Sequence, residues 1–589
     1  MLKVERTSSW HIFLLCIFAI FILSTVHVSD TMMLASCPPS CECDASQRYI
    51  SCVEYVNDTL MFLFPNDTRK LDIRYQNWTV FNAKRISHLT HLRKLQLASC
   101  SIEEIENDFS TLQKLKRLDM KENLLSDSVF NTIGRMRQLK ELILDKNQLR
   151  LGENITFNNL EQIEYLSLSW NLIEVIPSFE GLAEVQKLFL SNNLIHTINS
   201  SAFVNLHKLE ELYLDANLIT QIEPGWSNNL QFLRHLDLSE NFLSESFRQQ
   251  HIIGLTQNTW IEVLSLSNNS LLQIPCKDIV KNTHLIHLDL SYNSITTIEN
   301  NCLNHLKYLK VLDLKSNKIK TIDEFALQTM SRLDTVILDN NSIRTLPPYW
   351  LRGTSVSHVN LNSNELVSLS NESFCGLENL VIVHLLKNSI SSISTGAFCG
   401  TSLETLVLEY NNLQVINASQ FECVSTLKEL FLSNNYIQEV NPAAFDGICL
   451  KTLHLHSNFL ESITENLVVR DSYEVLTLEN NPWRCDCHIE WMKDYYYSNS
   501  NITNVNIIEV LDRQIVCLSP NTLIDFTLFA LKDVDLICST FPSPLTIKLI
   551  LAISISIIGF VVSLNIMKLY CRFRELQKYE GSNEKTVAL

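Results

Sequence analysis

Two closely spaced histidines are the first candidates for metal chemistry in this chain. His454 and His456 are separated by one residue, so both side chains point to the same face if this segment is a β-strand. Two imidazoles on one face can bind a transition metal when a carboxylate or another ligand joins them. The neighbouring sequence supplies no third ligand, so we interpret the histidines as a surface pair and predict neither a metal ion nor a cofactor.

Two cysteine clusters offer a different chemistry, because four thiols can either bind zinc or form two disulfide bonds. The clusters are Cys37, Cys41, Cys43 and Cys52, and Cys485, Cys487, Cys517 and Cys538. Neither has the pair of CxxC units that zinc sites of this kind carry. We therefore predict disulfide bonds, for which four cysteines leave three pairings open.

Motifs of enzyme chemistry are absent from the sequence. It has no GxSxG, HExxH or paired-carboxylate arrangement, and its 12 glycines among 589 residues leave no glycine-rich phosphate loop. The net charge of −17 would repel the phosphates of a nucleic acid and favours a basic or neutral partner. We predict a binding protein, not an enzyme, with no nucleic acid among its partners.

A repeated phrase between Leu92 and Trp483 must position any functional surface. It reads Leu-x-x-Leu-x-Leu-x-x-Asn followed by an apolar residue, in about seventeen copies at intervals of roughly 24 residues. Alternation along a strand turns the leucines into one continuous core, and the polar position can bond buried backbone groups of neighbouring turns. The polar position is occupied by Cys100, Asn123, Asn147, Asn171, Asn193, Asn217, Asn241, Asn269, Asn293, Asn317, Asn341, Asn364, Asn388, Asn411, Asn435, Asn458 and Asn481.

The phrase and its period resemble the leucine-rich repeat, and this resemblance covers about two thirds of the chain. It implies an α/β solenoid: a horseshoe with a parallel sheet on its concave side, disulfide-bonded caps at both ends, and one transmembrane helix beyond them. A phenylalanine that recurs ten residues after the polar position then fills the core on the convex side. This phenylalanine is found at Phe157, Phe203, Phe374, Phe398, Phe421 and Phe445.

The cysteine clusters resemble the capping modules of extracellular leucine-rich-repeat proteins, including Toll receptors. The segments CPPSCEC (37–43) and NPWRCDC (481–487) flank the repeats, whose end turns would otherwise expose apolar core. The resemblance implies four bonds: Cys37–Cys43, Cys41–Cys52, Cys485–Cys517 and Cys487–Cys538.

Seven cysteines remain between the clusters, so at least one is free. Neighbouring repeats place several of them near each other, and about 5 Å between strands permits a disulfide bond. We predict the bonds Cys375–Cys399, Cys276–Cys302 and Cys423–Cys449, and a free, buried Cys100.

Apolar segments near both ends indicate a membrane protein. Lys3 and Arg6 precede an apolar run typical of a signal peptide, with an uncleaved anchor as the alternative. Residues 549–567 carry no charge, are long enough to span a bilayer, and are followed by Lys568 and Arg572. We predict a single-pass type I protein of the plasma membrane with an extracellular ectodomain.

The predicted segments follow the chain in seven parts. They are a signal peptide (1–35), an amino-terminal cysteine cap (36–70), repeats (71–480), a carboxyl-terminal cysteine cap (481–539), a stalk (540–548), a transmembrane helix (549–567) and a cytoplasmic tail (568–589). The tail is too short to bury a core, so we expect it to lack the intracellular signalling domain of the Toll receptors that the ectodomain resembles. Its end, 587–589, resembles a weak ligand for PDZ domains.

Glycosylation is expected on the ectodomain, because many N-x-S/T sequons occur in it. We predict glycans at Asn57, Asn66, Asn77, Asn154, Asn199, Asn371, Asn417 and Asn501. Asn268 and Asn340 also begin sequons, but they directly precede a polar position of the repeat and are expected to be poorly accessible.

A partner-binding surface is predicted on the outward side chains of the concave strands. Acidic residues recur there, and Tyr165, Phe189 and Tyr213 point outward from three successive repeats, close enough to form one aromatic patch. We predict that these three residues, together with Asp215 and Asp237, contact a partner. Solubility of the outward face is the alternative reason for its acidic residues.

The combination of features predicts a cell-surface receptor or adhesion molecule. It would recognise an extracellular protein, or a second copy of itself, through the repeat surface. The alternative is an innate-immune pattern-recognition or ligand-binding co-receptor that signals through a partner.

Overall fold

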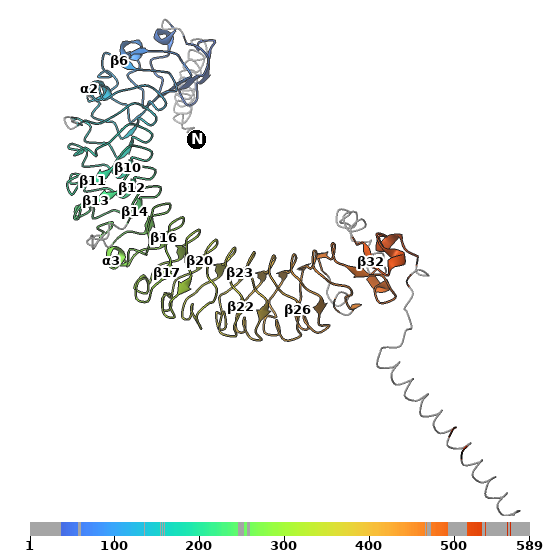
Figure 1. The fold of residues 1–589 in the computed structure, drawn as a ribbon. Helices are drawn as coiled ribbons and strands as arrows, with labels where there is room; N and C mark the ends of the chain where they lie inside the picture. Colours follow the sequence, from blue (N-terminus) through green and yellow to red (C-terminus); the bar gives the residue numbers. More distant parts are fainter. Residues whose placement is uncertain are drawn as a thin grey trace, which may run out of the picture. The chain divides into compact units, whose positions relative to one another are not determined.

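The computed structural model describes residues 37–56, 60–134, 136–152, 155, 157, 159–244, 252–255, 260–465, 467, 473–492, 515–532, 536, 562 and 566. They belong to two compact units, Met1–Asn481 and Pro482–Leu589, each of which is described by itself. Figure 1 shows the first unit as a stack of repeats that curves around one long sheet.

The long sheet lines the inner side of this curve and has 20 strands among the described residues. The first two strands pair antiparallel, and the later pairings are parallel, which confirms the predicted solenoid. The strands are β1 (Cys41–Asp44), β2 (Tyr49–Cys52), β3 (Lys70–Arg74), β5 (Lys94–Ala98), β7 (Arg117–Asp119), β8 (Glu141–Ile143), β9 (Tyr165–Ser167), β10 (Lys187–Phe189), β12 (Glu211–Tyr213), β14 (His235–Asp237), β15 (Val263–Ser265), β16 (His287–Asp289), β18 (Val311–Asp313), β20 (Thr335–Ile337), β21 (His358–Asn360), β23 (Ile382–His384), β25 (Thr405–Val407), β27 (Glu429–Phe431), β29 (Thr452–His454) and β30 (Val475–Thr477).

Shorter elements connect the strands, and Figure 1 shows several of them on the outer side of the curve. The short strands pair within two-stranded parallel sheets. These elements are β4 (Val80–Asn82), β6 (Glu104–Glu106), β11 (Thr197–Ile198), β13 (Gln221–Ile222), β17 (Thr297–Ile298), β19 (Thr321–Ile322), β22 (Ser368–Leu369), β24 (Ser392–Ile393), β26 (Val415–Ile416), β28 (Glu439–Val440), the α-helices α2 (Val129–Ile133) and α3 (Cys276–Ile279), and the 3-10 helices η1 (Met61–Leu63) and η2 (Ala83–Ile86).

Leucines at the centre of each inner strand form the core. Leu188, Leu212 and Leu236 are aligned in register on adjacent strands, and all three are 0% exposed. Their neighbours along the strand point the other way, because side chains alternate between the faces of a strand. The inner face of the sheet is therefore built from residues that the core does not need.

The asparagine of each repeat joins its own turn to the preceding one. Asn217 is 3% exposed and donates from Nδ2 to the carbonyl oxygens of Leu190 and Leu214, at 2.9 and 3.0 Å. Its Oδ1 accepts from the Ile195 amide at 3.1 Å. The same bonds recur along the solenoid, which confirms the predicted scaffold role.

The residue before each of these asparagines adopts a left-handed backbone, which the sequence did not indicate. Ala216, for example, has a φ of 53°, and its amide donates to the Ser239 carbonyl of the next turn at 3.0 Å. A left-handed non-glycine residue costs roughly 1 kcal/mol. The hydrogen bonds that this turn allows on both sides offset that cost.

Cys100 takes the place of the first asparagine. It is buried, and its Sγ donates to the Ala98 carbonyl oxygen at 3.2 Å. Burial raises the pKa of the thiol to about 11, so the sulfur stays protonated at neutral pH. The structure confirms that this cysteine is free and buried.

Aromatic rings fill the core behind the sheet, as predicted. Phe374 and Phe398 stack with centroids 5.4 Å apart, and Phe421 lies 6.1 Å from Phe445. Phe157 and Phe203 are bridged by Phe179, which the spacing had not singled out, at 5.7 and 6.3 Å.

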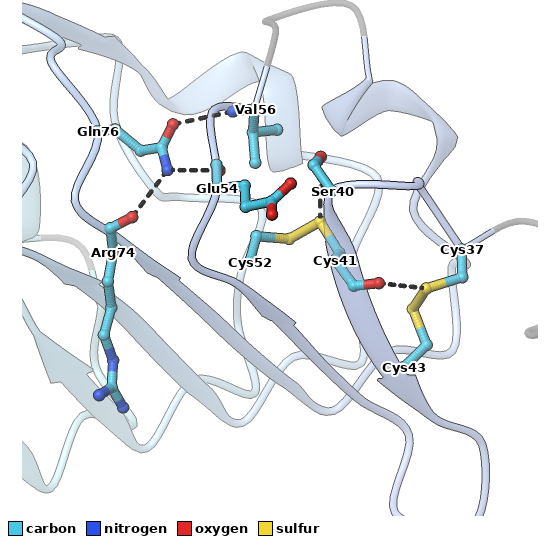
Figure 2. Close-up of a disulfide and its surroundings, with 9 residues drawn as sticks. All are labelled: Cys37, Ser40, Cys41, Cys43, Cys52, Glu54, Val56, Arg74 and Gln76. Carbon is cyan, nitrogen blue, oxygen red and sulfur yellow. Dashed lines mark hydrogen bonds between the residues drawn. A yellow bond between two sulfur atoms is a disulfide. The ribbon is translucent and has the colours of Figure 1, made fainter.

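The amino-terminal cap extends the long sheet. The Cys37–Cys43 and Cys41–Cys52 disulfide bonds are present as the resemblance implied, and β2 pairs in parallel with β3 of the repeats. Figure 2 shows Gln76 between the cap and the first repeat, where its side chain accepts from the Val56 amide at 2.9 Å and donates to the Glu54 carbonyl at 2.9 Å. The cap therefore continues the hydrogen bonding of the solenoid.

The described part of the second unit is small. It consists of the strands β31 (Trp483–Arg484) and β32 (Cys517–Ser519), which are parallel, and the 3-10 helices η4 (Asn521–Leu523) and η5 (Leu528–Ala530). The predicted Cys485–Cys517 bond is present. Cys487 is disulfide-bonded, and its predicted partner Cys538 lies outside the described residues.

Two of the three predicted bonds between repeats are wrong. Cys276–Cys302 is present, with Cα atoms 5.0 Å apart. Cys399, however, is bonded to Cys423, with Cα atoms 4.8 Å apart, and neither to Cys375.

The reason is that a sulfur forms a single disulfide bond, so the Cys399–Cys423 bond excludes both Cys375–Cys399 and Cys423–Cys449. Cys375 and Cys449 are consequently free, like Cys100. The turns that carry Cys375 and Cys399 are joined by the backbone instead, because the Gly376 amide donates to the Cys399 carbonyl at 2.8 Å.

Several predicted segments lie outside the described residues. These are the signal peptide (1–35), the stalk (540–548), the cytoplasmic tail (568–589) and most of the transmembrane segment (549–567). In the described parts of the chain, no helix is long and apolar enough to cross a membrane.

Asn411 and its neighbour Asn412 form a matched pair that tests how much the hydrogen bonds of a buried asparagine stabilise the fold. Asn411→Ala removes the partner of the Ile390 amide and one of the two donors to each of the Leu385 and Leu408 carbonyls, which keep the Asn388 and Asn435 side chains. A buried group without a partner costs about 1–3 kcal/mol, so the free energy of unfolding in a denaturant titration should fall by about 1–3 kcal/mol. Substitution of the exposed neighbour, Asn412→Ala, should change the free energy of unfolding by less than about 0.5 kcal/mol. An equal loss of stability in both variants would contradict the role assigned to the buried asparagine.

Thiol labelling of the unreduced protein tests the revised cysteine pairing. An alkylating reagent should modify exposed Cys449 first and half-buried Cys375 more slowly, and should reach buried Cys100 after denaturation. Cys399 and Cys423 should stay unlabelled until reduction. Recovery of a peptide pair linked through Cys375 and Cys399 would show that the sequence-based pairing was right.

Candidate functional site

Three aromatic side chains that we predicted to bind a partner lie together on the inner sheet. The rings of Tyr165 and Phe189 are 5.0 Å apart, and those of Phe189 and Tyr213 are 4.5 Å apart and nearly parallel, at 5°. His235 adds a fourth ring 4.8 Å from Tyr213. We call these four residues the aromatic patch. All four are partly accessible rather than buried.

The strand register shows why sequence spacing missed His235. Phe189 aligns with Tyr213 on the adjacent strand. Tyr165 lies in a different row, in which Lys187, Glu211 and His235 follow on the next three strands. The patch therefore crosses two rows of outward positions. Its contacts are partly diagonal, which aromatic side chains are long enough to make.

Glu211 links the patch to its polar surroundings. Its carboxylate accepts the Tyr213 hydroxyl at 3.2 Å and pairs with the Lys187 ammonium at 2.7 Å. Burial, together with the charge of Glu211, raises the pKa of Tyr213 to about 12, and burial lowers the pKa of His235. At neutral pH the patch presents uncharged rings.

Asp215 and Asp237, the other predicted contact residues, border the patch. Asp237 aligns with Tyr213 on the adjacent strand, and Asp215 follows Tyr213 by two residues. Asp215 accepts the Ser191 hydroxyl, and Asp237 accepts the Ser239 amide at 2.9 Å. Burial raises the pKa of Asp215 above its ordinary value. The structure thus brings all five predicted contact residues together.

The row of outward positions that contains Asp237 continues along the sheet with further acidic residues, which also have a structural role. Asp289 and Asp313 each accept the backbone amide two residues further on, at 2.9 Å, which supports the turn after the strand. Burial, followed by the charges of Asp289 and Asp339, raises the pKa of Asp313. Lys315 neutralises part of this charge through its pair with Asp339 at 3.4 Å.

A second cluster lies further along the same face and contradicts our reading of the two histidines. We expected no third ligand near His454 and His456, yet Glu409 joins them: one ligand atom of each residue lies within 4.8 Å of the others. Glu409 comes from two strands away, so no local pattern could reveal it. Burial lowers the pKa of His454, against the opposing effect of Glu409.

The predicted glycosylation sites that the structure describes are all exposed: Asn66, Asn77, Asn199, Asn371 and Asn417. Asn57, Asn154 and Asn501 lie outside the described residues. Asn268 and Asn340 are also exposed, because the left-handed turn before each buried asparagine points them outward, so our expectation of poor access was wrong.

Comparison with known sequences establishes the class. The Leucine rich repeat family matches residues 90–149, 137–195, 177–219, 207–263, 259–319, 307–355 and 401–460, more than half of the chain. The chain belongs to the leucine-rich repeat family.

Individual relatives match shorter stretches. The chain is 29% identical over 115 residues to Transforming growth factor beta activator LRRC33 of Danio rerio, which is 18% of this chain and 16% of that protein. It is 27% identical over 147 residues to Opticin of Bos taurus, 21% of this chain and 42% of that one. For Leucine-rich repeats and immunoglobulin-like domains protein 3 of Homo sapiens the values are 28% over 201 residues, 29% and 17%. The chain thus spans less than half the length of each relative.

Among solved structures, the glycosylated Toll–Spatzle complex of Drosophila contains a similar fold. The TM-score is 0.64 at 19% identity, over 83% of this chain and 72% of the matched chain. At this identity the similarity shows the fold.

The raised pKa of Asp313 predicts a pH-dependent gain from Asp313→Asn. Because the folded pKa lies above the ordinary 3.8, ionisation of Asp313 lowers stability as the pH rises through the raised value. The amide keeps an oxygen for the Lys315 N–H and carries no charge. The denaturation midpoint of the variant should exceed that of the wild type at neutral pH.

Below pH 3.8 Asp313 is protonated in both folded and unfolded states, so the two midpoints should converge. Denaturant titrations at the two pH values measure the difference. A gain that persists unchanged in acid would show that it does not come from the charge.

Proposed function

We propose that this chain is a cell-surface receptor or adhesion protein that binds an extracellular protein through the aromatic patch. The observation that carries the proposal is the run of four partly accessible rings, Tyr165, Phe189, Tyr213 and His235, on the inner sheet. The few residues that dominate the binding energy of protein interfaces are enriched in Trp, Tyr and Arg, and aromatic side chains bury a large area when a partner covers them. These rings stack on one another, but they lie on the face of the sheet opposite the leucine core.

Charge selects the kind of partner. Asp215 and Asp237 border the patch, and the chain carries a net charge of −17. Two copies that met through this face would bring like charges together, which is unfavourable. The proposed partner is therefore a different protein with basic residues around an apolar centre, and binding to a second copy is the competing outcome.

Membrane anchorage completes the proposal. A cleaved signal peptide, glycans on the exposed asparagines and a single membrane span at 549–567 would place the repeats outside the cell as a type I plasma-membrane protein. Disulfide-bonded caps suit that oxidising environment. The tail, with a weak PDZ-type end, would leave signalling to a partner.

The test is a cell-mixing assay with two differently labelled populations of non-adherent cells. Cells that express the chain should form mixed clusters with cells that do not express it. Simultaneous Tyr165→Ala, Phe189→Ala and Tyr213→Ala substitution should reduce cluster formation at least about tenfold. Each aromatic side chain that the partner buries contributes about 2 kcal/mol to the binding free energy.

The matched control replaces three exposed aromatic residues outside the patch, Phe232, Phe325 and Tyr436, which are 57%, 53% and 52% exposed. With equal surface expression, this control should cluster like the wild type. Clusters that require the chain on both cells would establish self-recognition instead. Absence of any clustering would favour the co-receptor reading and a soluble ligand, and equal loss in both triple variants would refute the assigned patch.

A further inference from the structure

The second cluster on the inner face consists of Glu409, His454 and His456, and the small residue Ser433 lies on the repeat between the glutamate and the histidines. Glu409, Ser433 and His456 each lie two residues beyond the end of β25, β27 and β29, at equivalent positions of successive repeats. Because Ser433 is short, the Glu409 side chain reaches across it towards the histidines. One ligand atom from each of Glu409, His454 and His456 lies within 4.8 Å of the other two.

Neighbouring groups hold these side chains in place. The Ser433 hydroxyl donates to Glu409 Oε1, and the Phe431 ring packs edge-on against His454 at 4.7 Å. The Nδ1 atom of His456 lies 3.2 Å from the Ser457 hydroxyl, which leaves its Nε2 atom for another partner. Such contacts are the ones that orient ligands around a metal ion.

The next strand adds oxygen atoms that lack partners. Thr477 of β30 aligns with His454, so Glu479 follows at the position beside His456. Glu479 Oε2 and Thr477 Oγ1 are both buried and have no hydrogen-bond partner. A buried carboxylate oxygen without a partner is costly, and a cation beside it would remove that cost.

An ordinary ion pair does not account for this arrangement. His454 Nδ1 is 4.0 Å from Glu409 Oε1, which is too far for a hydrogen bond, and such a pair would leave His456 and Glu479 unused. Across the described part of the chain, these three residues form the one group of His, Cys, Asp or Glu whose ligand atoms approach so closely.

We propose that Glu409, His454 and His456, with Glu479 as a fourth side chain, bind a transition-metal ion, most suitably Zn²⁺. Two imidazoles with one or two carboxylates are ligands that zinc accepts, whereas calcium and magnesium prefer oxygen atoms throughout. Four tetrahedral bonds of about 2.1 Å place the ligand atoms roughly 3.4 Å from each other. Side-chain rotations that move these atoms by on the order of 1 Å would bring them to this distance. The ion would join the side chains of three repeats: Glu409, the two histidines and Glu479. The proposal does not depend on the aromatic patch.

The test measures binding of zinc itself to the full chain, purified in a non-ionic detergent, stripped with a chelator and alkylated at its free cysteines. Equilibrium dialysis with metal analysis should find one Zn²⁺ per chain at micromolar concentration and no comparable Mg²⁺. Glu409→Gln, His454→Ala and His456→Ala should each weaken this binding at least about 100-fold, because loss of a supporting contact alone costs about 10–100-fold.

His384→Ala is the matched control, because His384 is a half-buried histidine on β23 of the same sheet and lies outside the cluster. It should bind zinc like the wild type. Glu409→Gln preserves the size of the side chain, so an unchanged denaturation midpoint in metal-free buffer separates lost binding from misfolding.

A second readout does not rely on stoichiometry. Zinc should raise the denaturation midpoint of the wild type and of His384→Ala, and should leave that of Glu409→Gln unchanged. Equal zinc binding by the wild type and all three cluster variants would overturn the proposal, as would a wild-type chain that binds no zinc.

Discussion

The hydrogen bonds of the buried asparagines are the constraint on which the other features depend. Each strand of the long sheet ends in a turn whose backbone groups are buried, and an unpaired buried group is costly. One amide side chain supplies two donors and one acceptor to its own turn and the preceding one, as Asn217 does. Because the repeats from Asn123 to Asn481 share this connection, their strands stay in register.

This arrangement leaves the inner face of the sheet open to other uses. The leucines form the core and the asparagines make most of the buried backbone hydrogen bonds of the turns, so most outward side chains are free of these tasks; aspartates such as Asp313 are exceptions that support the turn. Adjacent strands lie about 4.8 Å apart, close enough for rings to stack and for a glutamate to cross one strand. The aromatic patch and the cluster of Glu409, His454 and His456 are both products of that spacing.

Sequence reasoning was strongest where the pattern is local and weakest where two repeats must be compared in space. The parallel sheet, the buried asparagines, the cap disulfides and the aromatic core were predicted because each follows from spacing within a repeat or from a resemblance. The pairing of Cys399 was not, because cysteines lie one repeat away on both sides of it. His235 was missed because the patch occupies two rows of positions, and His235 lies three strands from Tyr165 in the row that does not contain Phe189 and Tyr213.

By itself, the sequence determined the repeated unit and the direction in which each side chain points, because strand alternation and the buried polar position act over a few residues. The tertiary structure decided which outward side chains meet. Glu409 lies just beyond β25 and His454 ends β29, with β27 between them, and their approach depends on register and on the small size of Ser433. Contacts of this kind arise from the stacking of repeats, which no single repeat encodes.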